Sequence, residues 1–271
     1  MVIAFRGLES QSVEAGRCGM KALILASGRE EGMYDEEGFH NNAMRIFEDR
    51  HLIQYSLDAA IQSKAEEILI AVGCGAEEII NAFGITYRDI RVKYVLLKEH
   101  GFLNAMVHAR EALAHDDFII FQGDEIVCDP HPYEMIENFY EQDLFIECGV
   151  VQVPVTQVIG HTYGVIYDPY DYRVYRIVDK PRRPVNSFMG TSICVFRNEI
   201  VEFLDRICTD ERKEKNELPD LMQCVIDDGY AVKLFVVGSG CIEKDMMDDP
   251  GNCEQERVEE HEWKLELEPV F

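Results

Sequence analysis

Residues 21–28 have the sequence KALILASG, and this stretch decides the class of fold that the chain can form. Its apolar residues run without a break up to the small residues Ser27 and Gly28, which predicts a buried strand followed by a tight turn. Similar apolar runs recur downstream, and residues with helical apolar spacing separate them. The expected strands cover residues 21–27, 67–72, 91–97 and 118–121, and the expected helices cover residues 52–61, 76–83 and 102–113. This alternation predicts βαβ units and a mostly parallel sheet with helices on both faces.

The sequence after residue 130 has a different texture. Residues 131–142 predict one more helix, and a last helix runs from Leu218 to Ile226, with Pro219 in its first turn. Between these helices, closely spaced β-rich segments predict a more open, partly antiparallel portion. These segments cover residues 144–153, 163–168, 172–178 and 191–197. The expected fold is therefore a three-layer α/β/α domain with a mixed, mostly parallel central sheet and a β-rich portion.

Composition and charge narrow the classes of function. The chain has 271 residues, with 26 Lys and Arg against 51 Asp and Glu, so its formal net charge is −25. Such a charge repels polyanions, which excludes non-specific binding to nucleic acid or to an anionic membrane. No apolar run reaches the roughly 18 residues that a spanning helix needs, and residues 1–20 lack the apolar stretch of a secretory signal.

The cysteines indicate the compartment in which the protein is expected to lie. There are nine, none of them in a C-x-x-C pair, and several lie within apolar runs. This usage predicts free, buried thiols in a reducing environment, not a disulfide framework or a zinc site. We therefore expect a cytoplasmic protein.

Two strand ends carry residues suited to ligand binding. In an open α/β sheet, ligands bind beyond the carboxyl ends of the strands. Ala26-Ser27-Gly28 ends the first strand with small residues, which let backbone N–H groups approach an anion, and Gly123-Asp124 brings a carboxylate to the same edge. Each feature alone is also consistent with an ordinary turn or cap.

Further motifs lie between and after these two turns, in a characteristic order. They are Gly101-Phe-Leu-Asn-Ala-Met106, Tyr163-Gly164-Val165, Asp179-Lys180-Pro181, Gly190-Thr191 and Glu217-Leu-Pro-Asp-Leu221. Together with Lys21–Gly28 and Gly123-Asp124, this order resembles the sugar-1-phosphate nucleotidyltransferase family, which makes nucleotide-diphospho-sugars. The resemblance runs from about Met20 to Asp249. It implies a nucleotidyltransferase-like domain over residues 20–249, an N-terminal extension over residues 1–19 and an acidic C-terminal tail over residues 250–271.

The resemblance implies a reaction and its partners. A sugar-1-phosphate oxygen attacks the α-phosphorus of a nucleoside triphosphate in line, and pyrophosphate leaves. With no covalent enzyme intermediate, the protein has to position the reactants and neutralise charge. Mg²⁺ is the expected cofactor, and homo-oligomers are common in the family. The β-rich portion would bind the sugar.

The resemblance also assigns roles to individual residues. Asp124 and Glu243 match the metal ligands, and Lys180 matches the lysine that binds the sugar phosphate. The expected catalytic residues are Asp124, Lys180 and Arg29. The expected nucleotide-binding residues are Ala26, Ser27, Gly28, Gly101 and Gly123, with the base packing on Gly101. The expected sugar-binding residues are Gly164, Asp179 and Thr191, with Asp179 replacing the family's usual Glu.

The first loop departs from the family pattern. That loop is usually Gly-rich and ends in Thr-Arg, with Pro-Lys some residues later, whereas this chain has Asn41-Asn42 at the Pro-Lys position and five carboxylates between residues 30 and 37. A like-charge contact at about 4 Å costs about 1 kcal/mol in bulk water and about 4 kcal/mol at an effective dielectric of about 20. Arg29, Arg45 and Arg50 are the candidates to replace the missing cations.

Two alternatives stay open at this point. The acidic loop favours a catalytically silent homologue that senses a nucleotide sugar or acts as a regulatory subunit, while the retained Asp124, Lys180 and Glu243 favour an enzyme. A nucleotidyltransferase for a non-sugar phosphate or phosphonate would keep the nucleotide half of the site and change the sugar half.

Overall fold

The computed structural model describes residues 20–28, 41–99, 101–113, 115–153, 162–207 and 217–243. The expected extension over residues 1–19, the acidic residues of the first loop, Arg29 and the expected tail over residues 250–271 lie outside this part of the chain.

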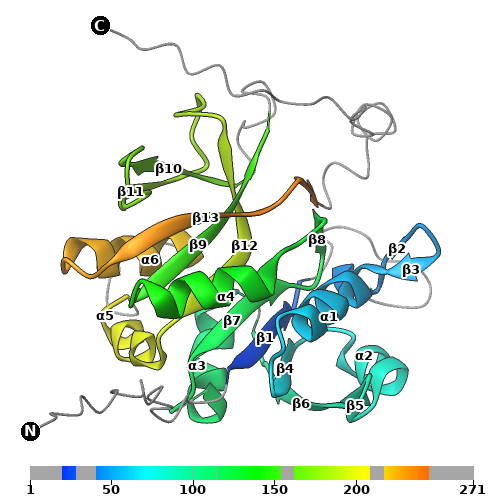
Figure 1. The fold of residues 1–271 in the computed structure, drawn as a ribbon. Coiled ribbons are helices and arrows are strands. Elements are labelled where there is room, and N and C mark those ends of the chain that lie inside the picture. The colour runs from blue at the N-terminus through cyan, green and yellow to red at the C-terminus, as the bar shows by residue number, and fades with distance from the viewer. Residues whose placement is uncertain are drawn as a thin grey trace, which may run out of the picture.

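An eight-stranded sheet forms the centre of the molecule (Figure 1). Its strands, in spatial order, are β13 (Val232–Gly238), β9 (Ile146–Gln152), β12 (Phe188–Phe196), β7 (Phe118–Gln122), β1 (Lys21–Ala26), β4 (Glu67–Val72), β6 (Ile90–Leu96) and β5 (Thr86–Tyr87). Strands β7, β1, β4 and β6 are mutually parallel, as is the β13–β9 pair, whereas β12 is antiparallel to both of its neighbours. The mixed, mostly parallel sheet that the sequence predicts is confirmed.

Helices cover both faces of this sheet, as Figure 1 shows. On one face lie α1 (Leu52–Gln62), α2 (Ala76–Phe83) and α4 (Pro132–Glu141). On the other lie α3 (Phe102–Leu113), α5 (Leu204–Ile207) and α6 (Leu218–Asp227). Two 3-10 helices, η1 (Asn42–Met44) and η2 (Asn198–Phe203), complete the set in the described residues.

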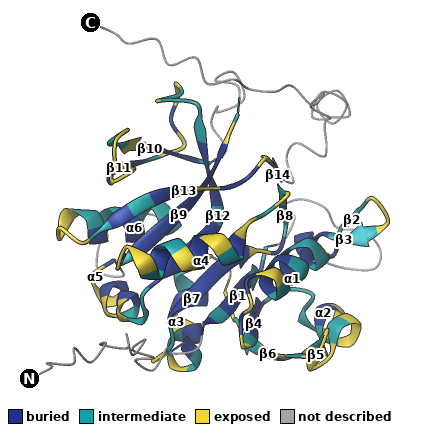
Figure 2. Cartoon of the chain, in the orientation of Figure 1, coloured by how far each residue is buried: buried dark blue, intermediate teal, exposed yellow. Residues whose placement is uncertain are grey.

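Alternation along the buried strands divides the core into two layers. In β1, Leu23 packs toward α3, while Ala22 and Ile24 pack toward α1. All three are fully buried, because a strand with helices on both faces has no exposed side. Figure 2 shows the buried residues gathered in the central strands, and exposed positions on the outer turns of the helices.

The β-rich segments divide between the central sheet and small outlying sheets. β9 and β12 extend the central sheet, whereas β10 (Tyr163–Tyr167) and β11 (Val174–Asp179) form a separate antiparallel pair beyond its edge (Figure 1). Two further antiparallel pairs are β8 (Glu125–Cys128) with β14 (Gly240–Glu243), and β2 (Ile46–Phe47) with β3 (Arg50–His51). These short strands were not expected from the sequence, because two to four residues carry too little periodicity to identify.

Six of the nine cysteines lie in the described part of the chain, and all six are free thiols. Cys148, Cys194 and Cys241 are buried as expected, whereas Cys74, Cys128 and Cys224 are only partly buried. Among the described residues, no helix is long and apolar enough to cross a membrane.

Candidate active site

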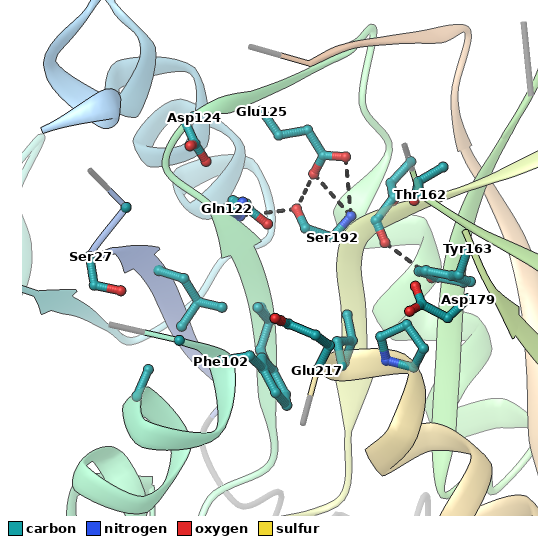
Figure 3. Close-up of a pocket in the computed structure, with 18 of the residues that line it drawn as sticks. Ser27, Phe102, Gln122, Asp124, Glu125, Thr162, Tyr163, Asp179, Ser192 and Glu217 are labelled. Carbon is teal, nitrogen blue, oxygen red and sulfur yellow. Dashed lines mark hydrogen bonds between the residues drawn. The ribbon is translucent and has the colours of Figure 1, made fainter. Parts of the chain in front are cut away.

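A cavity of about 470 Å³ opens at the carboxyl ends of β1 and β7, on the side of the sheet that α3 and α6 cover. The residues that line it come from the carboxyl ends of these strands, from the first turn of α3, from the β10–β11 pair and from the start of α6. In Figure 3, Ser27 and Asp124 lie on one side of this cavity, and Thr162, Tyr163 and Asp179 lie on the other. The fold thus brings together segments that are about 150 residues apart in the sequence.

The first wall is the turn after β1 together with the turn after β7. Gly28 lies so close to both Asn42 and Asp124 that a Cβ at this position would be 3.2 Å from Asn42 Nδ2 and 3.4 Å from Asp124 Oδ2. The Asn42 amide donates a hydrogen bond of 3.4 Å to Asp124 Oδ2. The other amide atom, Oδ1, is buried and has no hydrogen-bond partner among the described residues.

Asn41 holds this wall in place without lining the cavity. Its Nδ2 donates to the backbone oxygens of Ala26 and Cys74, each at 2.7 Å, and its Oδ1 accepts from the Ala43 N–H at 2.9 Å. The side chain is fully buried. In addition, the Asn42 N–H donates to the Gly28 oxygen at 3.2 Å, which joins the two ends of the first loop.

The opposite wall comes from β10, β11 and β12. Lys180 follows directly after β11 with an unusual φ of 40°, and its N–H donates to the Thr162 oxygen at 3.0 Å. The Tyr163 hydroxyl donates to the Thr191 oxygen at 3.0 Å. Its ring packs so tightly on Gly190 that a Cβ there would lie 2.4 Å from ring atoms. Asp179, Lys180 and Thr191 therefore line the cavity from a fixed backbone.

The floor of the cavity is formed by the starts of α3 and α6. Gly101 precedes α3 with a φ of 116°, a conformation that favours glycine. Glu217 caps α6 through a capping box with Asp220, and it lines the cavity together with Leu218.

Glu125 completes the edge next to Asp124. Its carboxylate accepts hydrogen bonds from the Ser192 N–H at 2.9 Å, from the Ser192 hydroxyl and from the Cys241 thiol at 3.1 Å (Figure 3 shows the Ser192 bonds). Burial raises the pKa of the Glu125 carboxyl, although the bonds from Ser192 and Cys241 oppose the shift.

The cavity is acidic in the described part of the chain. Asp124, Glu125, Asp179 and Glu217 line it, and Lys180 is the lining cation. Arg45 and Arg50 are not among the lining residues. Arg50 pairs with Asp58 at 2.5 Å and lies 4.6 Å from the centre of the Tyr55 ring, so it is engaged elsewhere.

The expected site residues fall into three groups. Those that line the cavity are Ser27, Gly28, Gly101, Asp124, Asp179, Lys180 and Thr191. Those that lie outside its lining are Ala26, which is buried toward α1, Gly123, which packs against Ala43, and Gly164, which packs against Val185. Glu243 pairs with Glu125 across the β8–β14 ladder, and its side chain, like Arg29, lies outside what the structure describes.

Sequence reasoning did not select several lining residues. Thr162 and Ser192 lie beside selected motifs, and Glu217 begins a motif that was noted only for its order. Glu125 directly follows Gly123-Asp124, and Asn42 was considered only as the residue at the position of the family's lysine. The signal that could have found Thr162, Glu125 and Ser192 is their position directly next to a motif that was selected.

Comparison with known proteins agrees with this arrangement. The nucleotidyl transferase family matches residues 21–240. A UTP–glucose-1-phosphate uridylyltransferase of Staphylococcus haemolyticus is 27% identical over 203 residues, which cover 71% of this chain and 61% of that protein. A glucose-1-phosphate thymidylyltransferase of Streptomyces griseus is 26% identical over 222 residues, 80% of this chain and 60% of that protein. The chain thus spans about 60% of the length of these relatives.

A solved structure shows the same fold. The UDP-glucose pyrophosphorylase of Acinetobacter baumannii superposes with a TM-score of 0.69 at 19% identity, and the match covers 83% of this chain and 88% of that one. The family match extends from β1 through the first residue of β14, so it includes every element that lines the cavity. This chain belongs to the nucleotidyl transferase family.

Proposed function

We propose that the protein transfers a nucleotidyl group from a nucleoside triphosphate to a sugar-1-phosphate, releasing pyrophosphate. The observation that carries this proposal is the pairing of two walls across one cavity. Asp124 and the Ser27–Gly28 turn form one wall, and Lys180 and Asp179 form the other. The first wall suits a phosphate chain with a bound cation, and the second suits a phosphorylated sugar. Relatives of this chain carry the names of glucose-1-phosphate uridylyl- and thymidylyltransferases.

Oxygen donors at the first wall fit Mg²⁺. Asp124 supplies a carboxylate, and the buried Oδ1 of the neighbouring Asn42 has no hydrogen-bond partner in the part of the chain that the structure describes. Mg²⁺ binds through one or two carboxylates together with substrate phosphates. We propose that Asp124 and Glu243 hold it. When bound, the cation neutralises charge on the phosphate oxygens.

The chain's own residues do the positioning. The Lys180 ammonium attracts the sugar phosphate and orients its oxygen toward the α-phosphorus. Glycine at position 28 lets the backbone of this turn lie close to Asn42 and Asp124, because a side chain there would meet both of them, and the backbone N–H groups of the turn then face the phosphate chain. Holding both reactants in line supplies much of the rate enhancement of such a reaction. The carboxylates of the cavity oppose anionic substrates, which makes the cation and Lys180 more important here.

The variant Lys180→Ala tests the sugar half of the site independently of the nucleotide half. We expect KM for the sugar-1-phosphate to rise by about 10- to 100-fold, because a charge-assisted contact is lost, and KM for the nucleotide to change little. Steady-state kinetics with each substrate varied in turn measure this. Arg183→Ala, on the same loop but outside the cavity lining, is the control, and a uniform rise in both KM values would contradict the assigned role.

The direct test is pyrophosphate release. Purified protein with Mg²⁺ is given each common nucleoside triphosphate with a panel of sugar-1-phosphates and with phosphorylated non-sugar alcohols. We expect release that requires both substrates and identifies the base and the acceptor. Release only with non-sugar acceptors would support the phosphate-alcohol alternative. Binding without release in any combination would support the silent homologue and overturn the transferase.

A further inference from the structure

Glu125 occupies a central place in the wall between the two halves of the cavity. It follows Asp124 in the chain, and both of its carboxylate oxygens accept hydrogen bonds from the protein. Three donor groups meet it: the Ser192 N–H, the Ser192 hydroxyl and the Cys241 thiol. A carboxylate used in this way is engaged with β12 and β14 and is not left for a substrate or a cation.

The strand that Glu125 holds is irregular at this point. β12 pairs with β9 up to Gly190 and again from Cys194, with a break in register between them. Its pairing with β7 covers only Cys194–Phe196. The intervening N–H groups therefore find other acceptors: Glu125 accepts from Ser192, and Thr191 Oγ1 accepts from Ile193 at 3.2 Å. Without Glu125, the Ser192 N–H would lose its acceptor.

We propose that Glu125 is a positioning residue that fixes the Thr191–Ser192 segment relative to Asp124. The inference rests on the proposed function. Thr191 and Ser192 line the sugar side of the cavity, and Asp124 lines the phosphate side. Because Asp124 and Glu125 are adjacent, a rigid link from Glu125 to Ser192 sets the spacing between the two walls. A displacement of about 1 Å in such a site costs about 100-fold in rate.

Two neighbouring bonds extend this link. The Ser192 hydroxyl also accepts from the Gln122 N–H at 3.0 Å, which joins it to the end of β7. The Cys241 thiol brings in β14, where Glu243 lies opposite Glu125 in the ladder. Glu125 thus connects β7, β12 and β14.

The test compares ligands that reach one wall with ligands that span both. Isothermal titration of the full chain with Mg²⁺ uses UTP and dTTP as nucleotides, and UDP-glucose and dTDP-glucose as ligands that also carry a sugar. For Glu125→Gln, we expect affinity for the nucleotide-sugar that the unmodified protein binds to fall by about 10- to 100-fold. Affinity for the matching triphosphate should stay within about twofold. Where turnover is present, KM for the sugar-1-phosphate should rise more than kcat falls.

Matched variants separate positioning from general damage. Glu147→Gln changes another buried glutamate, which lies on the α4 side of the sheet, and should leave both affinities unchanged. Ser192→Ala removes one donor to Glu125 and should lower nucleotide-sugar affinity by a smaller factor. It replaces Glu125→Gln as the test if that variant does not fold. Glu125→Asp should recover part of the lost affinity.

The outcomes distinguish this inference from the proposed function. Selective loss of nucleotide-sugar affinity without pyrophosphate release by the unmodified protein would refute the transfer reaction and support the role of Glu125. An equal loss for both ligands, or no loss for either, would overturn that role. Failure of the unmodified protein to bind any of these ligands, or any other common nucleoside triphosphate, would overturn both.

Discussion

Asp124→Asn is expected to abolish Mg²⁺-dependent turnover, with a loss of about 1000-fold or more, while the fold stays intact. A neutral amide keeps the shape of the side chain and removes the charge that, in the proposed reaction, would hold a divalent cation against the phosphate chain. Asp124 lies at the end of β7 beside Asn42 and Gly28, where the structure offers oxygen donors to such a cation. Pyrophosphate release measures activity, and Mn²⁺ binding followed by paramagnetic resonance measures the cation directly.

The control is Asp129→Asn. Asp129 follows β8, accepts a hydrogen bond from the Ser239 hydroxyl at 3.0 Å and is outside the cavity lining. It should keep full activity and unchanged Mn²⁺ affinity. Turnover within threefold of the unmodified rate in Asp124→Asn would remove Asp124 from the site.

The largest effect on stability is expected from Glu147. This carboxyl is fully buried on β9, where its Oε1 accepts a hydrogen bond from the Asn138 amide, while Oε2 has no hydrogen-bond partner within the described ranges. Burial raises its pKa to about 8, and the Asn138 hydrogen bond and the charge of Lys233 only partly oppose that shift. The folded protein therefore holds a proton that the unfolded chain releases at an ordinary pKa.

The sign of the pH dependence follows from this difference. Below a pH of about 4.5, Glu147 is protonated in both the folded and the unfolded state, so its ionisation does not change the free energy of unfolding. Between about 4.5 and about 8, only the unfolded state ionises, so the free energy of unfolding falls by up to about 1.4 kcal/mol per pH unit. The total is on the order of 5 kcal/mol at most.

The variant Glu147→Gln cannot ionise, so it should not show this fall in the free energy of unfolding with rising pH. At pH 8 we expect the variant to be more stable than the unmodified protein by at least about 2 kcal/mol, with the difference vanishing near pH 4.5. Urea unfolding at several pH values measures it. The control, Glu67→Gln, removes a carboxylate that pairs with Lys93 at 2.7 Å, so it should not stabilise the fold. Identical pH profiles for Glu147→Gln and the unmodified protein would show that Glu147 ionises normally.

Much of the fold could be predicted because burial leaves a strong sequence signal. The strands β1, β4 and β7 have apolar runs that a doubly covered sheet explains, and α1, α3 and α6 show clear helical spacing. The short strands β8 and β14 could not be found, since their register depends on side chains that meet from distant parts of the chain. Asn41 is another case, because its bonds to the Ala26 and Cys74 oxygens leave no local pattern.

The site was predictable where a motif marks a strand end. Asp124 lies two residues after the end of β7 and Lys180 directly follows β11, and both line the cavity. Glu125 was missed because its role depends on a break in the β12 ladder, and only three-dimensional pairing shows that break. Gly164 shows the limit of a motif, since its neighbour Tyr163 lines the cavity while Gly164 itself packs against Val185.

The bonds that join Gly28 to Asn42 and Asn41 to Ala26 hold the two flanks of residues 29–40 together. The entropic cost of closing a loop rises only slowly with the number of residues between its ends. Changes of charge or length within residues 29–40 should therefore cost the central sheet little free energy of unfolding. This tolerance accommodates the five carboxylates between residues 30 and 37.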